Sequence, residues 1–264
     1  MGRLLITTNP IVWHDLSSLL DSPTRVSFSS EAKKAIQGSH NVLKKILKSE
    51  QQVYGVNTGF GKLSAVSIDQ VDLKQLQLNL VRSHACGVGK PLDMGVTRIT
   101  MVLKLMTWCK GYSGVRPVLA NLILGMLNHD ILPLIPRQGS VGASGDLAPL
   151  AHMARAMIGE GDVHFQDRIM PAMIALKEAN LEPIVLEAKE GLSLINGTQV
   201  STALAIRALS ESKKLLETAD ISGALSTEAS LSTRVAFTPK IHKLKKHPGQ
   251  VVSATNIYNM LKGS

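Results

Sequence analysis

The segment with the most distinctive chemistry is glycine-rich and spans residues 139–149, where the sequence reads Gly-Ser-Val-Gly-Ala-Ser-Gly-Asp-Leu-Ala-Pro. Apolar residues at helical spacing follow, so we predict that this loop runs into a helix over residues 147–158. Asp146 is placed to cap that helix, and Pro149 is tolerated in its first turn, where no intrahelical hydrogen bond is lost. The loop therefore meets the positive end of a helix dipole, where backbone N–H groups converge.

Three consecutive small residues, Ala143, Ser144 and Gly145, lie in the centre of this loop. Glycine has the least hindered backbone amide, alanine adds little bulk, and serine carries a β-hydroxyl. The loop lacks the Gly-Lys-Ser/Thr of a phosphate-binding loop, and a nucleophile elbow would need glycine in place of Asp146. For the tripeptide alone, a plain capped helix start is the remaining alternative.

Three further stretches contain glycine beside polar side chains. Residues 54–61 read Tyr-Gly-Val-Asn-Thr-Gly-Phe-Gly, residues 79–89 end a helix near His84, and residues 194–199 read Leu-Ile-Asn-Gly-Thr-Gln. Taken singly, each has an ordinary structural interpretation: an amphipathic residue that anchors a loop, a histidine at a helix C-terminus, and an Asn-Gly turn before a helix. They become candidates for chemistry only together with the loop at residues 139–149.

Helical periodicity dominates the remaining sequence and predicts an all-α fold, a helical bundle with glycine-rich loops. Ser30, just before Glu31, is the predicted N-cap of the first helix. Residues 198–233 are interpreted as two helices that meet near Ser222 and Gly223. The other predicted elements are helices over residues 69–83, 93–110 and 250–261, a helix that begins at Pro117, and a small β-hairpin over residues 162–170.

The composition is that of a globular chain. The 264 residues are 44% hydrophobic but only 3% aromatic, which favours helices packed by aliphatic side chains. The net charge of +9 is interpreted as solvated helical faces, because the densest basic cluster, residues 240–247, has no interleaved Phe, Tyr or Trp for stacking on nucleic-acid bases. Cys86 and Cys109 fit reduced thiols, and no apolar run suits a signal peptide or a membrane span. We therefore expect a cytoplasmic protein with no nucleic-acid or membrane partner.

The ten residues from Gly142 to Ala151 resemble the signature of the aromatic amino acid ammonia-lyases, and a chance match over ten positions is improbable. In that family the backbone cyclises: the amide nitrogen at the position of Gly145 attacks the carbonyl at the position of Ala143. Loss of water, including the hydroxyl of Ser144, leaves a methylidene-imidazolone. The resemblance thus implies a protein-derived electrophile with no external cofactor and no metal, in a mainly α fold of the aromatic amino acid lyase, fumarase-aspartase-like type.

The other stretches support the resemblance, which implies a role for several of their residues. Tyr54, in a mobile loop, would be the base that removes the substrate β-proton, so its pKa of about 10 must be lowered by its surroundings. The Ser83-His84 pair is similar to the histidine-selecting version of the site, in which His84 holds the substrate imidazole. Asn196 would help to bind the substrate or the imidazolone oxygen, and Asp146 would hold the loop.

The resemblance to the histidine-selective branch implies elimination of ammonia from L-histidine to give trans-urocanate, the first step of histidine breakdown. The family's chains are substantially longer, so residues 1–264 are expected to be the amino-terminal, catalytic-loop portion, with the carboxy-terminal helical half absent. That half carries the arginine and tyrosine that handle the substrate carboxylate and the helices that assemble a homotetramer. We therefore expect this chain to need homo-oligomerisation or a complementary carboxy-terminal half, and to have little activity alone.

Alternatives from different classes stay open at this point. A phenylalanine or tyrosine ammonia-lyase, or an aminomutase, would place a different pair at Ser83 and His84. A non-catalytic assembly module would keep the motif without cyclising it. A basic nucleic-acid binder would show salt-dependent binding to DNA or RNA.

Overall fold

The fold is mainly helical, as predicted, in a computed structural model that describes residues 2–49, 53, 55–58 and 70–264. These residues form two compact units, within residues 1–207 and 208–264. None of the helices described is both long and apolar enough to cross a lipid bilayer. The helices are α1 (Trp13–Ser17), α2 (Ser30–Leu47), α3 (Gln70–His84), α4 (Met94–Cys109), α5 (Pro117–Asn128), α6 (Leu147–Met157), α7 (Ala172–Glu178), α8 (Glu190–Ile195), α9 (Gln199–Ala229), α10 (Pro239–Lys243) and α11 (Pro248–Met260), with short 3-10 turns η1 (Ser18–Leu20) and η3 (Arg234–Phe237).

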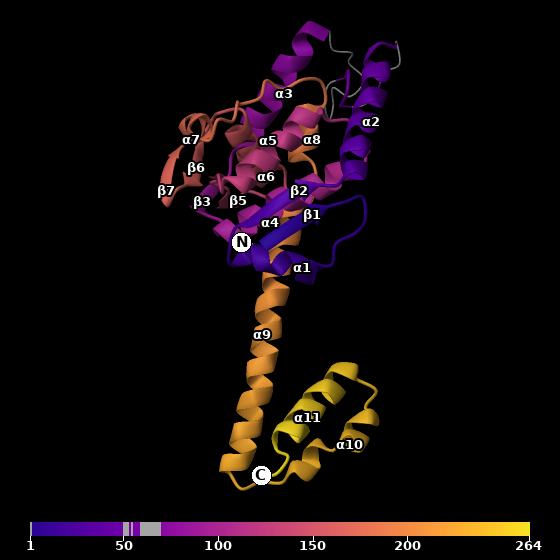
Figure 1. The fold of residues 1–264 in the computed structure, drawn as a ribbon, viewed down its shortest axis with the longest axis vertical. Helices are drawn as coiled ribbons and strands as arrows, with labels where there is room; N and C mark the ends of the chain where they lie inside the picture. The colour runs from indigo at the N-terminus through magenta and orange to yellow at the C-terminus, as the bar shows by residue number, and fades with distance from the viewer. Residues whose placement is uncertain (1, 50–52, 54, 59–69) are drawn as a thin grey trace. The chain divides into compact units, whose positions relative to one another are not determined.

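Helix α4 is the centre of the first unit and packs against α2 and α5 (Figure 1). Its largest side chains, among them Ile99, Leu105 and Trp108, are buried because aliphatic residues surround the helix on nearly every side. A helix buried all round is expected to be apolar all round. Lys104 breaks that rule, since its side chain is fully buried as well.

The N-terminus of α2 lies one residue earlier than predicted. Ser29, not Ser30, is the N-cap: its backbone is extended (φ −68°, ψ 164°), and its hydroxyl accepts a hydrogen bond of 3.2 Å from the Ala32 N–H. Ser30 is already the first helical residue. With two adjacent serines, the one whose backbone leaves the helix takes the capping position.

The predicted break near Ser222 and Gly223 is wrong, because α9 is one continuous helix of 31 residues. A glycine inside a helix costs only about 1 kcal/mol relative to alanine, which neighbouring contacts can offset. Within the second unit, a Cβ at Gly223 would lie 3.4 Å from Cδ1 of Ile257 in α11. The glycine therefore permits close packing of two helices rather than ending one.

Short strands add three small sheets that a purely helical interpretation does not anticipate. The predicted hairpin is confirmed, and its turn residues Gln166 and Asp167 both have positive φ, as a two-residue primed turn requires. The first sheet is a parallel pair joined through α1, the second an antiparallel pair beside the glycine-rich loop. The strands are β1 (Gly2–Ile6) with β2 (Thr24–Phe28), β3 (Val88–Pro91) with β5 (Pro136–Gln138), and β4 (Leu132–Pro133) with β6 (Asp162–Phe165) and β7 (Arg168–Pro171).

Three helices position the candidate site. Helix α6 packs against α3 and α8, which also contact each other (Figure 1). The glycine-rich loop enters α6 at its N-terminus, while His84 ends α3 and Asn196 follows the last residue of α8. The site therefore lies where one helix begins and two helices end.

Candidate active site

The glycine-rich loop exposes the first two residues of the tripeptide, and its backbone bends sharply just before and just after them. Ala143 and Ser144 are exposed, and the flanking Gly142 and Gly145 have φ values of +67° and +119°. A Cβ at Gly145 would lie 2.5 Å from the carbonyl oxygen of Gly197, a distance at which an alanine cannot fit without moving the backbone. Gly145 is thus required for both its conformation and its contact.

Asp146 is at the N-cap position of α6, as predicted, but its side chain does not cap that helix. The carboxylate is buried and accepts hydrogen bonds from the Ser201 N–H (2.7 Å), the Ser201 hydroxyl (2.5 Å) and the Ser140 hydroxyl (3.1 Å). Ser201 is the third residue of α9, so the carboxylate caps α9 by accepting from one of its unpaired N–H groups. The prediction was wrong because the partner helix comes from distant sequence.

The turn between α8 and α9 holds the loop from the other side. The Asp146 N–H donates to the carbonyl oxygen of Gly197 at 2.7 Å, next to the position where Gly145 meets the same oxygen. Gly197 has a φ of +140°. The Asn196 side chain is exposed at this turn, so it is available to a ligand beside the loop.

Lys104 lies beneath this turn and was not predicted as a site residue. Its Nζ donates to the carbonyl oxygens of Ser193 (3.3 Å) and Asn196 (3.1 Å), at the C-terminal end of α8. Burial lowers the pKa of Lys104 to about 7, while the nearby Asp146 carboxylate acts in the opposite direction. The only sequence signal was a charge inside the apolar run at residues 101–106.

His84 ends α3 with its ring tied to its own helix. Nδ1 lies 2.8 Å from the carbonyl oxygen of Leu80 and 3.2 Å from the hydroxyl of Ser83. Because a carbonyl oxygen only accepts, we assign the proton to Nδ1, which leaves Nε2 as an acceptor. A ligand N–H, such as that of an imidazole, can donate to such a nitrogen.

His152, in α6, binds the segment that begins at His84 (residues 84–89), which we call the His84 segment. Its Nε2 accepts a hydrogen bond of 3.0 Å from the Gly87 N–H, and burial together with Arg155 lowers its pKa. Gly139 is packed against the same turn, since a Cβ there would lie 3.1 Å from the Gly87 Cα. The His84 segment, the tripeptide loop and the Asn196 turn are therefore neighbours, although they are far apart in sequence.

Tyr54, the predicted base, lies outside the described residues. Of its segment, Val53 and residues 55–58 are described, and they form a turn in which the Val53 N–H donates to Oδ1 of Asn57 at 2.8 Å. Gly55 in this turn has a φ of +69°.

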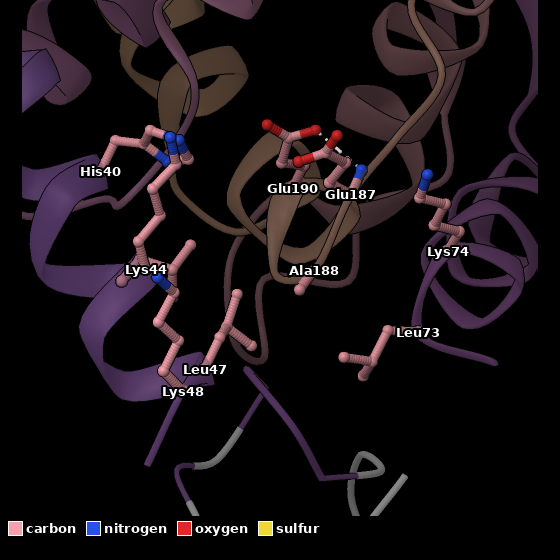
Figure 2. Close-up of a pocket in the computed structure, with 10 residues that line it drawn as sticks. His40, Lys44, Leu47, Lys48, Leu73, Lys74, Glu187, Ala188 and Glu190 are labelled. Atoms are coloured by element: carbon pink, nitrogen blue, oxygen red, sulfur yellow. Dashed lines mark hydrogen bonds between the residues drawn. The ribbon is translucent and has the colours of Figure 1, made fainter. Parts of the chain in front are cut away.

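A separate cavity of about 560 Å³ contains none of the predicted site residues. Figure 2 shows Lys44 and Lys48 on one wall, Lys74 on the other, and Glu187 and Glu190 between them. Both carboxylates are already paired with the Arg116 guanidinium, at 2.9 Å and 2.7 Å. The two acidic side chains of this cavity are therefore neutralised, which leaves its lysines as the charged groups that line it.

Comparisons with known proteins show which family the chain belongs to. The family model of the aromatic amino acid lyases matches residues 11–264. A probable histidine ammonia-lyase of Halobacterium salinarum is 47% identical over 92% of this chain and 46% of its own, and the histidine ammonia-lyase of Legionella pneumophila is 45% identical over 94% and 49%. The chain spans about half the length of the curated relatives it matches.

Two solved structures have the same fold over nearly the whole chain. The histidine ammonia-lyase from Trypanosoma cruzi has a TM-score of 0.89 and 37% identity, covering 97% of this chain and 50% of that one. The phenylalanine aminomutase of Pantoea agglomerans has a TM-score of 0.94 and 30% identity, covering 100% and 51%.

Replacing Gly145 by alanine is expected to destabilise the first unit far more than the same change at Gly142. Nothing lies within 4 Å of a Cβ at Gly142, so G142A meets only the cost of a positive φ, about 1 kcal/mol. G145A must also displace the Gly197 carbonyl, and we expect a loss of about 3 kcal/mol or more. Denaturant unfolding of both variants checks this, and equal losses would contradict the contact.

The stability of the chain should rise between pH 7 and pH 10 through Lys104. Its folded pKa of about 7 lies below the ordinary 10.5, so in this window the unfolded state binds more protons. Below pH 7 both states are protonated and the cost of burying the charge is fully present. We expect a contribution of roughly 1 kcal/mol per pH unit, absent from K104M and kept in K177M, whose lysine is exposed on α7. Parallel pH profiles of unfolding for wild type and K104M would refute the assignment.

Proposed function

The chain belongs to the aromatic amino acid lyase family, and we propose that it supplies the amino-terminal half of a histidine ammonia-lyase, which eliminates ammonia from L-histidine to give trans-urocanate. The observation that carries the proposal is the exposed Ala143-Ser144-Gly145 loop, clamped by main-chain contacts on its glycine side. Relatives named histidine ammonia-lyase, at 42–47% identity, support the choice of substrate.

The loop has the features needed to form a methylidene-imidazolone from its own backbone. Gly145 has no Cβ to hinder its nitrogen, and the Gly197 carbonyl fixes the Gly145 main chain from behind. A bond would form between the Gly145 nitrogen and the Ala143 carbonyl carbon. The Ala143 oxygen leaves as one water with the amide protons of Gly145 and Ser144, which leaves a C=N bond to the Ser144 nitrogen. The Ser144 hydroxyl leaves as a second water with the proton from its Cα. Once formed, the ring would supply an electrophilic methylene.

We assign the surrounding side chains by their positions. Nε2 of His84 would accept the imidazole N–H of the substrate, because Nδ1 is already held by the Leu80 carbonyl. Ser83 Oγ donates to the same carbonyl and sets the ring plane beside it. Asn196, exposed at the α8–α9 turn, would donate to the substrate or to the ring oxygen. Tyr54 would remove the β-proton.

A phenylalanine or tyrosine lyase, or an aminomutase, is less well supported. Four solved structures of those enzymes are 28–32% identical to this chain, compared with 37% for the histidine ammonia-lyase from Trypanosoma cruzi. The imidazole acceptor at His84 would also find no hydrogen-bond donor on a phenyl ring. A preference for phenylalanine over histidine in a turnover assay would overturn the role of His84.

We further propose that the protein works in the cytoplasm as a homo-oligomer, a tetramer in its complete form. In support, α9 has neighbouring aliphatic side chains that are exposed to solvent: Leu215 is 69% exposed and Leu216 is 63% exposed. Exposed apolar surface of this kind often marks an interaction site. Cys86 and Cys109 are both free thiols, as a reducing compartment allows.

The intact mass of the purified chain tests the proposed ring directly. We expect a mass lower by two waters than the sequence requires, together with the ultraviolet absorbance of the new conjugated system. S144A lacks the hydroxyl that leaves and should not show the two-water loss. A wild-type chain with unmodified mass would favour the non-catalytic module.

The 264-residue chain assayed by itself is expected to form little urocanate from L-histidine. It spans about half of its relatives' length, and the family resemblance places the arginine that binds the substrate carboxylate in the half that these residues do not cover. Urocanate absorbance in a purified, S144A-controlled assay measures this. Robust turnover by the isolated chain would contradict the expectation.

A further inference from the structure

The most unusual group in the molecule is the Lys104 side chain, which lies wholly buried in the central helix α4. An unpaired polar group in such a place is costly, and a buried amine normally finds acceptors. The acceptors here are main-chain oxygens of Ser193 and Asn196, at the end of α8. Helix ends leave such carbonyls unpaired and carry partial negative charge, so the amine satisfies both at once.

Lys104 binds the residue that precedes Gly197, whose carbonyl oxygen contacts the tripeptide loop. We call this contact between Gly197 and Gly145 the clamp. The Asn196 carbonyl receives Nζ at 3.1 Å, and the carbonyl oxygen of the next residue, Gly197, meets Gly145 and accepts the Asp146 N–H. The turn at residues 196–197 is therefore hydrogen-bonded to α4 on one side and contacts the tripeptide loop on its opposite side. Moving that turn would release the Gly145 backbone.

The same turn is bounded by a second buried charge. The Asp146 carboxylate caps the N-terminus of α9 through Ser201, while Lys104 satisfies the C-terminus of α8. Lys104 thus binds the C-terminal end of α8, and Asp146 binds the N-terminal end of α9. A cationic group suits the first position and an anionic group suits the second. Their joint effect is to leave the connecting turn little freedom.

We propose that Lys104 is a positioning residue for ring formation: its amine holds the Asn196–Gly197 turn against Gly145, and without it the loop no longer brings the Gly145 nitrogen and the Ala143 carbonyl together. The inference rests on the proposed function for its chemistry, but its geometric part stands by itself. Two N–H groups of a neutral amine suffice for the two carbonyls, so the clamp persists whether or not Lys104 is protonated.

The test compares K104M, which keeps the length and apolar stem of the side chain, with K177M as the control. Native-state hydrogen exchange read by mass spectrometry reports on the clamp, through the Asp146 and Ser201 amides, and intact mass reports on ring formation. In K104M we expect these amides to exchange at least about tenfold faster and the two-water loss to be absent from most molecules. K177M should match the wild type in both measurements.

The outcomes separate this inference from the proposed function. If K104M is folded, with wild-type exchange and the two-water loss, the role of Lys104 is overturned. If the wild-type chain itself is unmodified but K104M still exchanges faster, the clamp stands and the proposed ring chemistry of this chain fails. If K104M does not fold, K104R and K104Q are compared instead. The role is supported if K104R keeps slow amide exchange and the two-water loss while K104Q, with its shorter side chain, does not. Equal behaviour of the two variants overturns it.

Discussion

Two stretches of main chain approach so closely at the candidate site that no side chain fits between them. The carbonyl oxygen of Gly197 occupies the place of a Cβ on Gly145 and accepts the N–H of Asp146. Gly197 itself has a φ of +140°, a conformation that favours glycine. Glycine therefore suits both residues, through the contact at Gly145 and through the backbone conformation at Gly197. Because two flexible residues meet there, the contact has to be maintained by the structure around them.

That support comes from buried polar groups that lie at helix ends. A buried carboxylate or amine is expensive unless its hydrogen bonds are made. Asp146 meets this condition at the positive end of α9 and Lys104 at the negative end of α8, so each charge is matched to a helix terminus. The arrangement ties α4, the α8–α9 turn and the glycine-rich loop into one network. Removing Lys104 would take the amine donor from the Ser193 and Asn196 carbonyls, and removing Asp146 would take the acceptor from the Ser201 N–H.

The chemical groups themselves lie at the surface of this network. Ala143, Ser144 and the Asn196 side chain are exposed, and His84 is half-buried with its Nδ1 already engaged. A buried, hydrogen-bonded support beneath exposed candidate residues suits a site that would hold a constrained backbone and still admit a small molecule. The aromatic amino acid lyases share this fold over the whole chain, as the TM-scores of 0.89 and 0.94 indicate.

The sequence by itself predicted the family, most helices and the candidate tripeptide, because these depend on local patterns: ten consecutive residues, helical periodicity, and small residues in a turn. Lys104 and the true partner of Asp146 were decided only by tertiary structure, since Ser201 lies 55 residues from Asp146 and Asn196 lies 92 from Lys104. The continuity of α9 through Gly223, where the helix packs closely against Ile257 of α11, was likewise seen only in the structure. Local sequence predicts which backbone conformations are available, but which carbonyl a buried amine reaches depends on how distant helices pack.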